Sequence, residues 1–81
     1  MQDSIENLIY FVVKKLVLSP ESVTVEKQFN YHDRAVHYRV KVADDDMPRV
    51  IGKQGRIAKS IRNIVKSVAL KNNIKVLLDI G

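Results

Sequence analysis

Four residues, Gly52-Lys53-Gln54-Gly55, place a cation between two glycines at the start of a basic stretch of the chain. Glycine has no Cβ, so backbone at such positions can turn sharply and approach a ligand closely. The unpaired N–H groups of the first turn of a helix favour an anion. If a helix begins at Arg56, this pattern is therefore typical of a contact with a phosphate backbone.

The charges of the chain are divided unevenly between its two halves. Residues 1–46 hold eight acidic and six basic residues, whereas residues 47–81 hold eight basic residues and only one acid, Asp79. The net charge is +5. Because the basic half contains the glycine pair, this asymmetry favours a surface that binds a polyanion.

Two nucleotide-binding motifs resemble the glycine pair but do not fit it. The phosphate-binding loop of nucleotide hydrolases requires Gly-x4-Gly-Lys-Ser/Thr, whereas here Gln54 follows Lys53 and no glycine lies upstream. The dinucleotide fingerprint requires three glycines after a strand, and here only two are present, after a predicted helix. By itself a Gly-x-x-Gly pattern is most often only a turn, so its context decides its interpretation.

The chain offers no clear catalytic or metal-binding set. It contains no cysteine, and we predict that His32 and His37 lie at the surface, with no partner placed for metal binding or catalysis. Asp44-Asp45-Asp46 lacks the downstream Glu of a calcium loop, and we predict instead that Asp45 or Asp46 caps a short helix. We therefore expect no enzyme activity and no cofactor. The absence of a signal segment or membrane span predicts a soluble, cytoplasmic protein.

The periodicity of apolar residues predicts the elements that position the glycine pair. The first is a helix over about residues 4–18, with an Asp3–Glu6 start that resembles a capping box and an end at Ser19-Pro20. Its packing face holds apolar residues at helical spacing: Ile5, Leu8, Ile9, Val12, Val13 and Leu16.

Three strands are predicted, at about residues 23–29, 35–42 and 75–80. The first two form a hairpin, with Val23, Val25 and Phe29 on the inner face of the first strand. In the second strand the alternation places His37, Arg39 and Lys41 on the outer face.

Two more helices are predicted, a short one at about 47–51 and a long one at about 56–71, joined by the loop 52–55. One side of the long helix would pack through Ile57, Ile61, Ile64, Val65 and Val68. Another side would carry Arg56, Lys59, Arg62 and Lys66. The order α-β-β-α-α-β predicts a single α+β domain over residues 1–81, with three helices on one face of a three-stranded sheet.

This order, with Ile-Gly-x-x-Gly joining two helices, resembles the type II KH domain. The sequence is most similar to the KhpA family of small bacterial KH proteins, and the resemblance covers essentially the whole chain. It rests on Val40-Lys41-Val42-Ala43, on Asp46-Met47, and on the block from Val50 to Lys59 followed by Ile61-Arg62. Pro48 departs from the family, which more often has glycine there; we expect it to stiffen the short helix.

The resemblance implies a mixed sheet and a groove beside the loop that binds single-stranded RNA. Gly52 and Gly55 would approach the phosphates, Lys53 and Arg56 would supply charge, and Gln54 would donate hydrogen bonds. Val50, Ile51 and Ile57 would form an apolar floor for the bases, although packing is also part of their role. The complete predicted site is Arg49, Val50, Ile51, Gly52, Lys53, Gln54, Gly55, Arg56, Ile57, Lys59 and Arg62.

The resemblance further implies a post-transcriptional regulator or RNA chaperone with little sequence preference. It would act as a dimer, either with itself or with a second KH protein, KhpB (also called Jag or EloR), and would affect cell elongation and division. A different hypothesis is an assembly module whose main interface is with protein and whose contact with RNA is secondary.

Overall fold

A computed structural model describes residues 3–80, so three residues of the predicted domain, 1, 2 and 81, lie outside the described part. The elements follow the predicted order α-β-β-α-α-β, and their boundaries either coincide with the predicted ones or differ from them by one or two residues. They are α1 (Ser4–Leu16), β1 (Thr24–Asn30), β2 (Ala35–Lys41), α2 (Met47–Ile51), α3 (Arg56–Lys71) and β3 (Val76–Ile80). Single 3-10 turns occur at Pro20–Ser22, Asp44–Asp46 and Lys53–Gly55.

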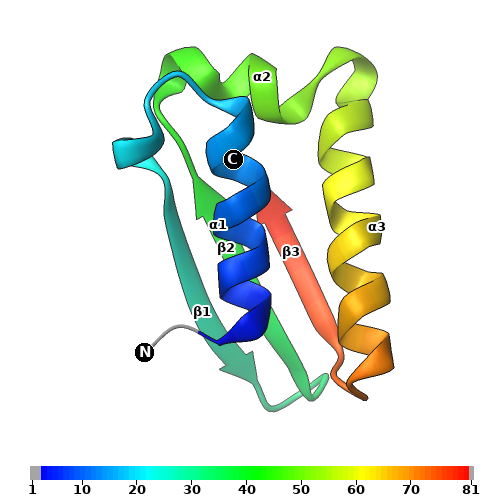
Figure 1. The fold of residues 1–81 in the computed structure, drawn as a ribbon. Coiled ribbons are helices and arrows are strands. Elements are labelled where there is room, and N and C mark those ends of the chain that lie inside the picture. Colours follow the sequence, from blue (N-terminus) through cyan, green and yellow to red (C-terminus); the bar gives the residue numbers. More distant parts are fainter. Residues whose placement is uncertain (1–2, 81) are drawn as a thin grey trace.

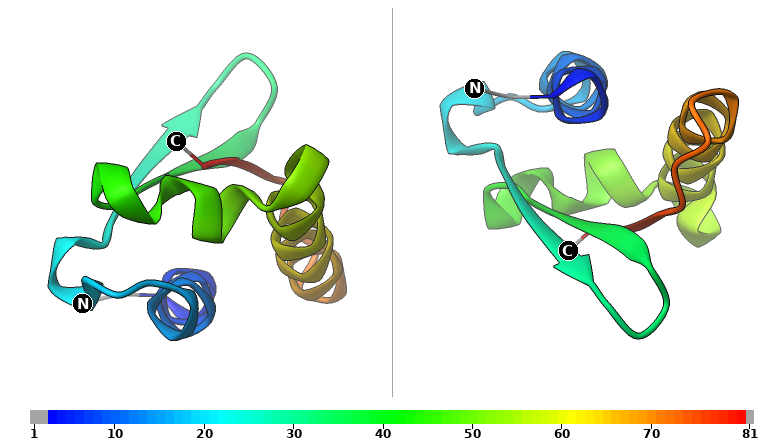
Figure 2. Two further views of the ribbon diagram at one scale, coloured as in Figure 1. Left: turned by 90° about the horizontal axis from the view of Figure 1, so that it is seen from above. Right: turned by 90° about the horizontal axis from the view of Figure 1, so that it is seen from below.

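The three strands form a mixed sheet in the order β1-β2-β3. β1 and β2 are antiparallel, with Thr24 opposite Lys41, and β2 and β3 are parallel, with Val36 opposite Val76. The two long helices, α1 and α3, lie over one face of this sheet, and α2 crosses the end where β2 finishes (Figure 1). Figure 2 shows that no helix covers the other face. The fold is therefore the predicted α+β arrangement.

The hydrophobic core lies between the helices and the covered face of the sheet. Most of its residues come from the periodic positions of α1 and α3 and from alternate positions of β2 and β3, as a half-buried sheet requires. Burial of each large aliphatic side chain contributes roughly 1.5–3 kcal/mol. The members are Ile5, Ile9, Val13, Val17, Val23, Tyr38, Val40, Val50, Ile61, Val65, Ala69, Val76 and Leu78.

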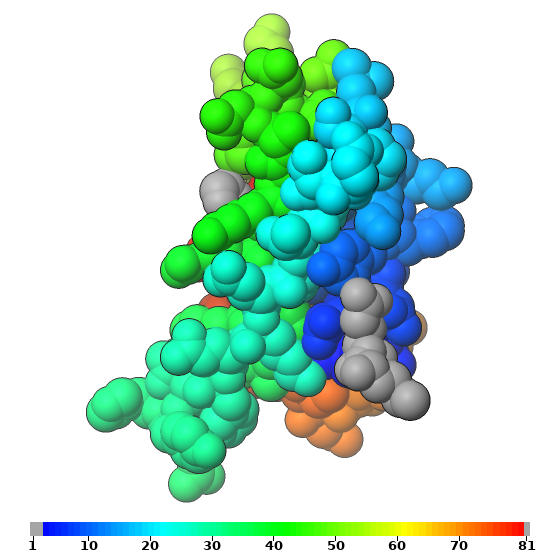
Figure 3. Space-filling view, turned by 90° about the vertical axis from the view of Figure 1, so that its left-hand side faces the viewer, coloured from blue at the N-terminus to red at the C-terminus, as the bar shows by residue number. Residues whose placement is uncertain are grey.

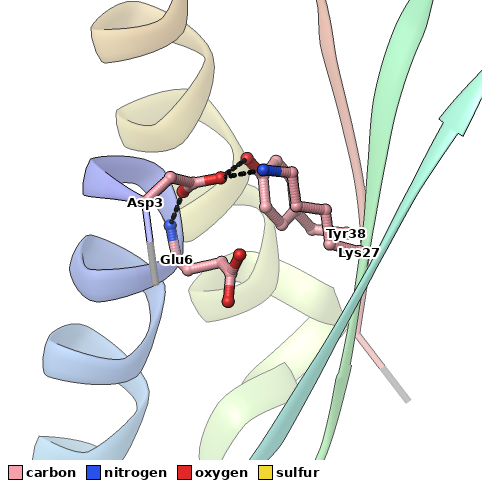
Figure 4. Close-up of polar contacts among 4 residues, drawn as sticks. All are labelled: Asp3, Glu6, Lys27 and Tyr38. Atoms are coloured by element: carbon pink, nitrogen blue, oxygen red, sulfur yellow. Dashed lines mark hydrogen bonds and ion pairs between the residues drawn. The ribbon is translucent and has the colours of Figure 1, made fainter. Parts of the chain in front are cut away.

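The start of α1 is held by Asp3, whose carboxylate joins the helix to the sheet (Figure 4). One oxygen accepts from the backbone N–H of Glu6 at 2.7 Å, which is one half of the predicted capping box. The other accepts from the Tyr38 hydroxyl at 2.9 Å and from the Lys27 ammonium. Burial would raise the pKa of Asp3, but its hydrogen bonds, above all that from Lys27, hold this pKa below its ordinary value.

The end of α1 comes at Leu16, two residues earlier than predicted, because a distant carboxylate binds the chain that follows. Asp46 is 1% exposed, and its two oxygens accept from the backbone N–H groups of Leu18 and Ser19, both at 3.0 Å. Asp46 precedes α2, as predicted, but its side chain makes no cap to that helix. The predicted capping role was therefore wrong: the buried carboxylate finds its hydrogen-bond partners in the backbone amides of another loop.

The β1–β2 hairpin extends past the helices, and this changes the environment of its end. Phe29 has the predicted parity in β1, yet its side chain is 46% exposed. The prediction that Phe29 forms part of the packed face was therefore wrong. Figure 3 shows the hairpin as a projection away from α1, so no helix lies over its tip. On β2, by contrast, Arg39 and Lys41 face outward as predicted and are exposed.

At each edge of the sheet, a backbone group forms a hydrogen bond with a helix side chain. The N–H of Val25 in β1 donates to the Tyr10 hydroxyl of α1 at 3.1 Å. At the opposite edge, Arg62 of α3 donates to the carbonyl of Leu78 in β3 at 3.0 Å. Unpaired strand edges are sites of unwanted pairing, so these two side chains both attach the helices and protect the sheet.

Candidate nucleic-acid interface

The turn between α2 and α3 contains three residues that depart from ordinary backbone geometry. Gly52 ends α2 with φ 76° and ψ 175°, a conformation open essentially to glycine only. Gln54 and Gly55 then adopt left-handed conformations, with φ of 57° and 73°. The N–H of Gly55 donates to the carbonyl of Gly52 at 3.2 Å, which closes the turn. The two glycines thus permit a tight connection between the helices.

The two glycines serve different physical purposes. A Cβ at Gly52 would lie 2.6 Å from Cγ1 of Ile57, so only glycine lets the first turn of α3 pack against the end of α2. A Cβ at Gly55 would meet no atom within 4 Å. Gly52 is therefore required for packing, whereas Gly55 borders open space that a ligand can occupy.

The side chains around this turn present positive charge to solvent. Lys53, Arg56 and Lys59 are exposed, and within residues 3–80 none of the three forms an ion pair. Arg56 makes one long hydrogen bond, 3.5 Å, to Oε1 of Gln54. Gly55, the residue before α3, supplies no side-chain acceptor for the first amides of that helix. Free cations and uncapped N–H groups therefore meet at one place.

Arg49 differs from these cations because it is held by its own helix region. Its guanidinium donates to the carbonyl of Asp45 at 3.0 Å and lies 3.5 Å from the Asp46 carboxylate. Its side chain is still 44% exposed. Arg49 can thus present its charge in a fixed direction beside the loop, with part of that charge offset by Asp46.

Two of the predicted site residues have partners within the fold. Val50 is 0% exposed and packs in the core, so it supports the loop from beneath and offers no surface to a base. Arg62 is half-buried and donates to the Leu78 carbonyl, so it ties α3 to β3. By contrast, Ile51 and Ile57 pack on the core but remain partly exposed beside the turn.

The buried stripe of α3 is rotated relative to the predicted one. It runs through Ala58, Ile61, Val65 and Ala69, and the two alanines let the helix lie close to its neighbours. Ile64 was predicted to pack but is 47% exposed. The predicted stripe contained only large aliphatic residues, whereas two alanines also belong to the buried face.

The sequence-based prediction did not include an aromatic pair that lies at the opposite end of the molecule. Phe29 and Tyr31 pack edge to face at the hairpin tip, with ring centroids 4.8 Å apart. The signal was present as two aromatic residues at a spacing of two, running from a strand into its turn.

The described part of the chain contains neither a candidate metal site nor a helix suited to span a membrane. Among residues 3–80, no three His, Asp or Glu side chains gather as metal ligands. Over the same residues, no helix is both long enough and apolar enough to cross a membrane.

Comparison with known proteins identifies a family. Residues 6–80 match the family described as KhpA/KhpB, KH domain. An RNA-binding protein KhpA of Listeria monocytogenes is 47% identical over 75 residues, which cover 93% of this chain and 96% of the relative. RNA-binding protein KhpA of Clostridium perfringens is 43% identical, covering 93% and 97%, and that of Chlamydia caviae is 37% identical, covering 93% and 94%. The family is thus one of RNA-binding KH proteins and not of enzymes.

A solved structure shares the fold at low sequence identity. It is Era in complex with MgGDPNP and nucleotides 1506-1542 of 16S ribosomal RNA, with a TM-score of 0.63 and 19% identity. The match covers 94% of this chain but only 28% of the Era chain, so it bears on the fold alone. The family match and the relatives lead to one conclusion: this chain belongs to the KhpA/KhpB family of KH-domain proteins.

Proposed function

We propose that the protein binds single-stranded RNA through the turn Gly52–Gly55 and the first turns of α3. The observation that carries the proposal is the meeting of exposed cations, which form no ion pair within residues 3–80, with uncapped helix amides around Gly55, where a Cβ-free backbone leaves open space. No carboxylate occurs from Met47 to Leu78 to oppose a polyanion. The relatives named RNA-binding protein KhpA give the same ligand class.

In this mechanism the backbone of about four nucleotides lies along the turn. The Gly55 backbone approaches a phosphate closely, and Lys53 and Arg56 offset its charge. Lys59, one turn further along α3, contacts the next phosphate, and Arg49 lies on the other side of the turn. Ile51 and Ile57 offer partly exposed aliphatic surface for a base. If about three phosphates are neutralised, log K falls with log salt at a slope of roughly −2.

The proposal is tested by fluorescence anisotropy of a short labelled RNA at low and moderate salt. The variant Lys53→Asp/Gln54→Asp reverses the charge of the turn; both side chains are exposed, and Asp tolerates the left-handed conformation at position 54. The matched control is Asn7→Asp/Lys14→Asp on the exposed side of α1, which likewise replaces one lysine and one side-chain amide and changes the net charge equally.

We expect the loop variant to lose RNA binding and the α1 variant to keep it, with both folded by circular dichroism. Equal loss in both variants would mean that only net charge matters. Retained binding in both would mean that the turn has no part in binding RNA, and the proposal would fail.

The protein would act as a dimer, with a second copy or with KhpB, since one short groove gives little affinity and two linked grooves raise it through effective concentration. Exposed apolar side chains on both long helices, Phe11 on α1 and Ile64 and Leu70 on α3, support this proposal. Sedimentation of the protein alone and with KhpB is the test. Monomers in both samples would contradict it.

In the cell, the protein would act as a post-transcriptional regulator or RNA chaperone and affect elongation and division. An assembly module with secondary RNA contact is the alternative, and the exposed apolar residues of the two helices favour it. Complementation of a deletion strain distinguishes the two. If RNA binding is the main role, the Lys53→Asp/Gln54→Asp protein should bind its partner yet fail to restore cell length; the alternative predicts full restoration.

A further inference from the structure

The tip of the β1–β2 hairpin carries aromatic surface that the core does not use. Tyr31 is 85% exposed and Phe29 is 46% exposed. Their rings meet edge to face, with an interplanar angle of 83°. In such a pair one ring contributes only its edge, so both of its faces remain free of the other ring. Figure 3 shows the tip projecting from the body of the molecule.

A cavity of about 400 Å³ lies against this aromatic pair. Its lining combines the two aromatic rings with amide and imidazole groups from Gln28, Asn30, His32 and His37. The volume falls in the range of small-ligand sites, and neutral donors and acceptors beside a ring are the groups that recognise base edges. The cavity therefore suits a flat heteroaromatic ligand better than a purely aliphatic one.

The charges around the tip favour an anionic ligand. Asp33 is the acidic residue of the turn, and it is engaged by the His37 ring at 3.2 Å and by the N–H of Ala35. Arg34 is exposed, and Lys75 lies close enough to Asp33 to interact with its charge. A base attached to a phosphate backbone would thus meet rings for stacking and cations for its phosphate.

We propose that the hairpin tip is a second RNA-binding site, in which Tyr31 stacks on one unpaired nucleobase and the side chains of Gln28 and Asn30 contact its edge. The tip and the turn Gly52–Gly55 lie at opposite ends of the sheet, since β1 runs away from α2 to reach the tip (Figure 1). An RNA that contacts only the turn would leave the tip empty, whereas a longer RNA would reach both.

The site rests on the proposed binding of RNA, and RNA length separates the two contacts. The molecule extends 33 Å in its longest direction. At a rise of about 3.4 Å per nucleotide, a strand of about 12 nucleotides spans about 40 Å and can reach both ends. A strand of about four nucleotides fills only the loop site.

Three substitutions of Tyr31 are compared by anisotropy with both RNA lengths. Tyr31→Phe keeps the ring, Tyr31→Leu keeps apolar area without a ring, and Tyr31→Ala removes both; all are at an exposed position, so the fold should persist. We expect Tyr31→Leu and Tyr31→Ala to weaken binding of the longer RNA by about tenfold, with Tyr31→Phe unchanged. The short RNA should bind all four proteins alike. Equal affinity of all four for the longer RNA would overturn the proposal.

A second experiment tests the tip even if the loop proves not to bind RNA. Adenosine monophosphate is titrated into the wild type and into Lys53→Asp/Gln54→Asp, and the ring protons of Tyr31 and Phe29 are followed by NMR. A stacked base should shift these signals in both proteins. Absence of a shift in both would mean that the tip binds no base.

Discussion

Arg62 of α3 donates a hydrogen bond from Nε to the carbonyl of Leu78 in β3, at 3.0 Å. The N–H and C=O of Leu78 face the free edge of the sheet, because the neighbouring odd-numbered residues of this segment bond to β2, as Lys75 does. A residue that the charge pattern placed among the RNA contacts thus has a structural partner of its own.

Arg62→Met should therefore lower stability by about 1.5 kcal/mol, the usual size of a hydrogen bond to a charged group. Lys59→Met removes the same charge one turn earlier in α3, from an exposed side chain without an ion pair among residues 3–80. Urea denaturation should show a loss only for Arg62→Met, while RNA affinity should fall more for Lys59→Met. The reverse ranking would contradict the structural assignment of Arg62.

The two glycines of the turn should respond differently to alanine. Gly52→Ala adds a Cβ against Ile57 in a conformation that only glycine tolerates, and should cost about 3 kcal/mol of stability. Gly55→Ala faces open space and should cost only about 1 kcal/mol, the strain of a left-handed alanine. Chemical denaturation of both variants checks the ranking. We expect Gly55→Ala, which stays folded, to lose RNA affinity because the added methyl group keeps phosphate at a distance.

Asp46→Asn should destabilise the protein by about 2 kcal/mol, because one of the two backbone amides bound by this buried side chain loses its acceptor and meets an NH₂ group. The control is Asp45→Asn, a neighbouring carboxylate that is exposed. The unfolding midpoint in urea should fall for Asp46→Asn and remain close to that of the wild type for Asp45→Asn. Similar midpoints in both variants would show that the carboxylate does not hold the loop after α1.

Stability should decline in acid partly through Asp3. Its pKa is lower in the folded protein than in the unfolded chain, so protons bind more tightly to the unfolded state. This contribution is complete above the ordinary Asp value of about 3.9 and is lost as pH falls through the lower folded pKa. Unfolding in urea across this range should show a shallower acid dependence for Asp3→Asn and for Lys27→Met. An unchanged acid limb in Asp3→Asn would contradict the role of Asp3.

Local pattern was sufficient to predict much of the fold. Apolar residues at helical spacing and alternating residues in strands specify elements directly, and the turn Gly52–Gly55 marks the junction of α2 and α3 without any knowledge of the fold. The errors came from contacts between distant parts of the chain. The end of α1 depends on Asp46, 27 and 28 residues away from the amides it binds.

The candidate site shows the same division. Charge and glycine spacing indicated the turn and the exposed cations around it, because these properties belong to neighbouring residues. The burial of Val50 and the bond from Arg62 to Leu78 depend on how α2 and α3 pack on the sheet. Phe29 has the correct parity but lies beyond the helices, and no pattern within β1 reports the length of the elements that cover it.

The parallel pairing of β2 with β3 also determines the order in which the molecule can assemble. It joins Val36 to Val76 and so closes a loop of about forty residues, whereas β1 and β2 meet across a short turn. Closing the longer loop has the larger entropic cost, so the hairpin should form early and β3 should dock late. The turn Gly52–Gly55 lies inside the longer loop, so docking of β3 should be the step that fixes α2 and α3 against the sheet.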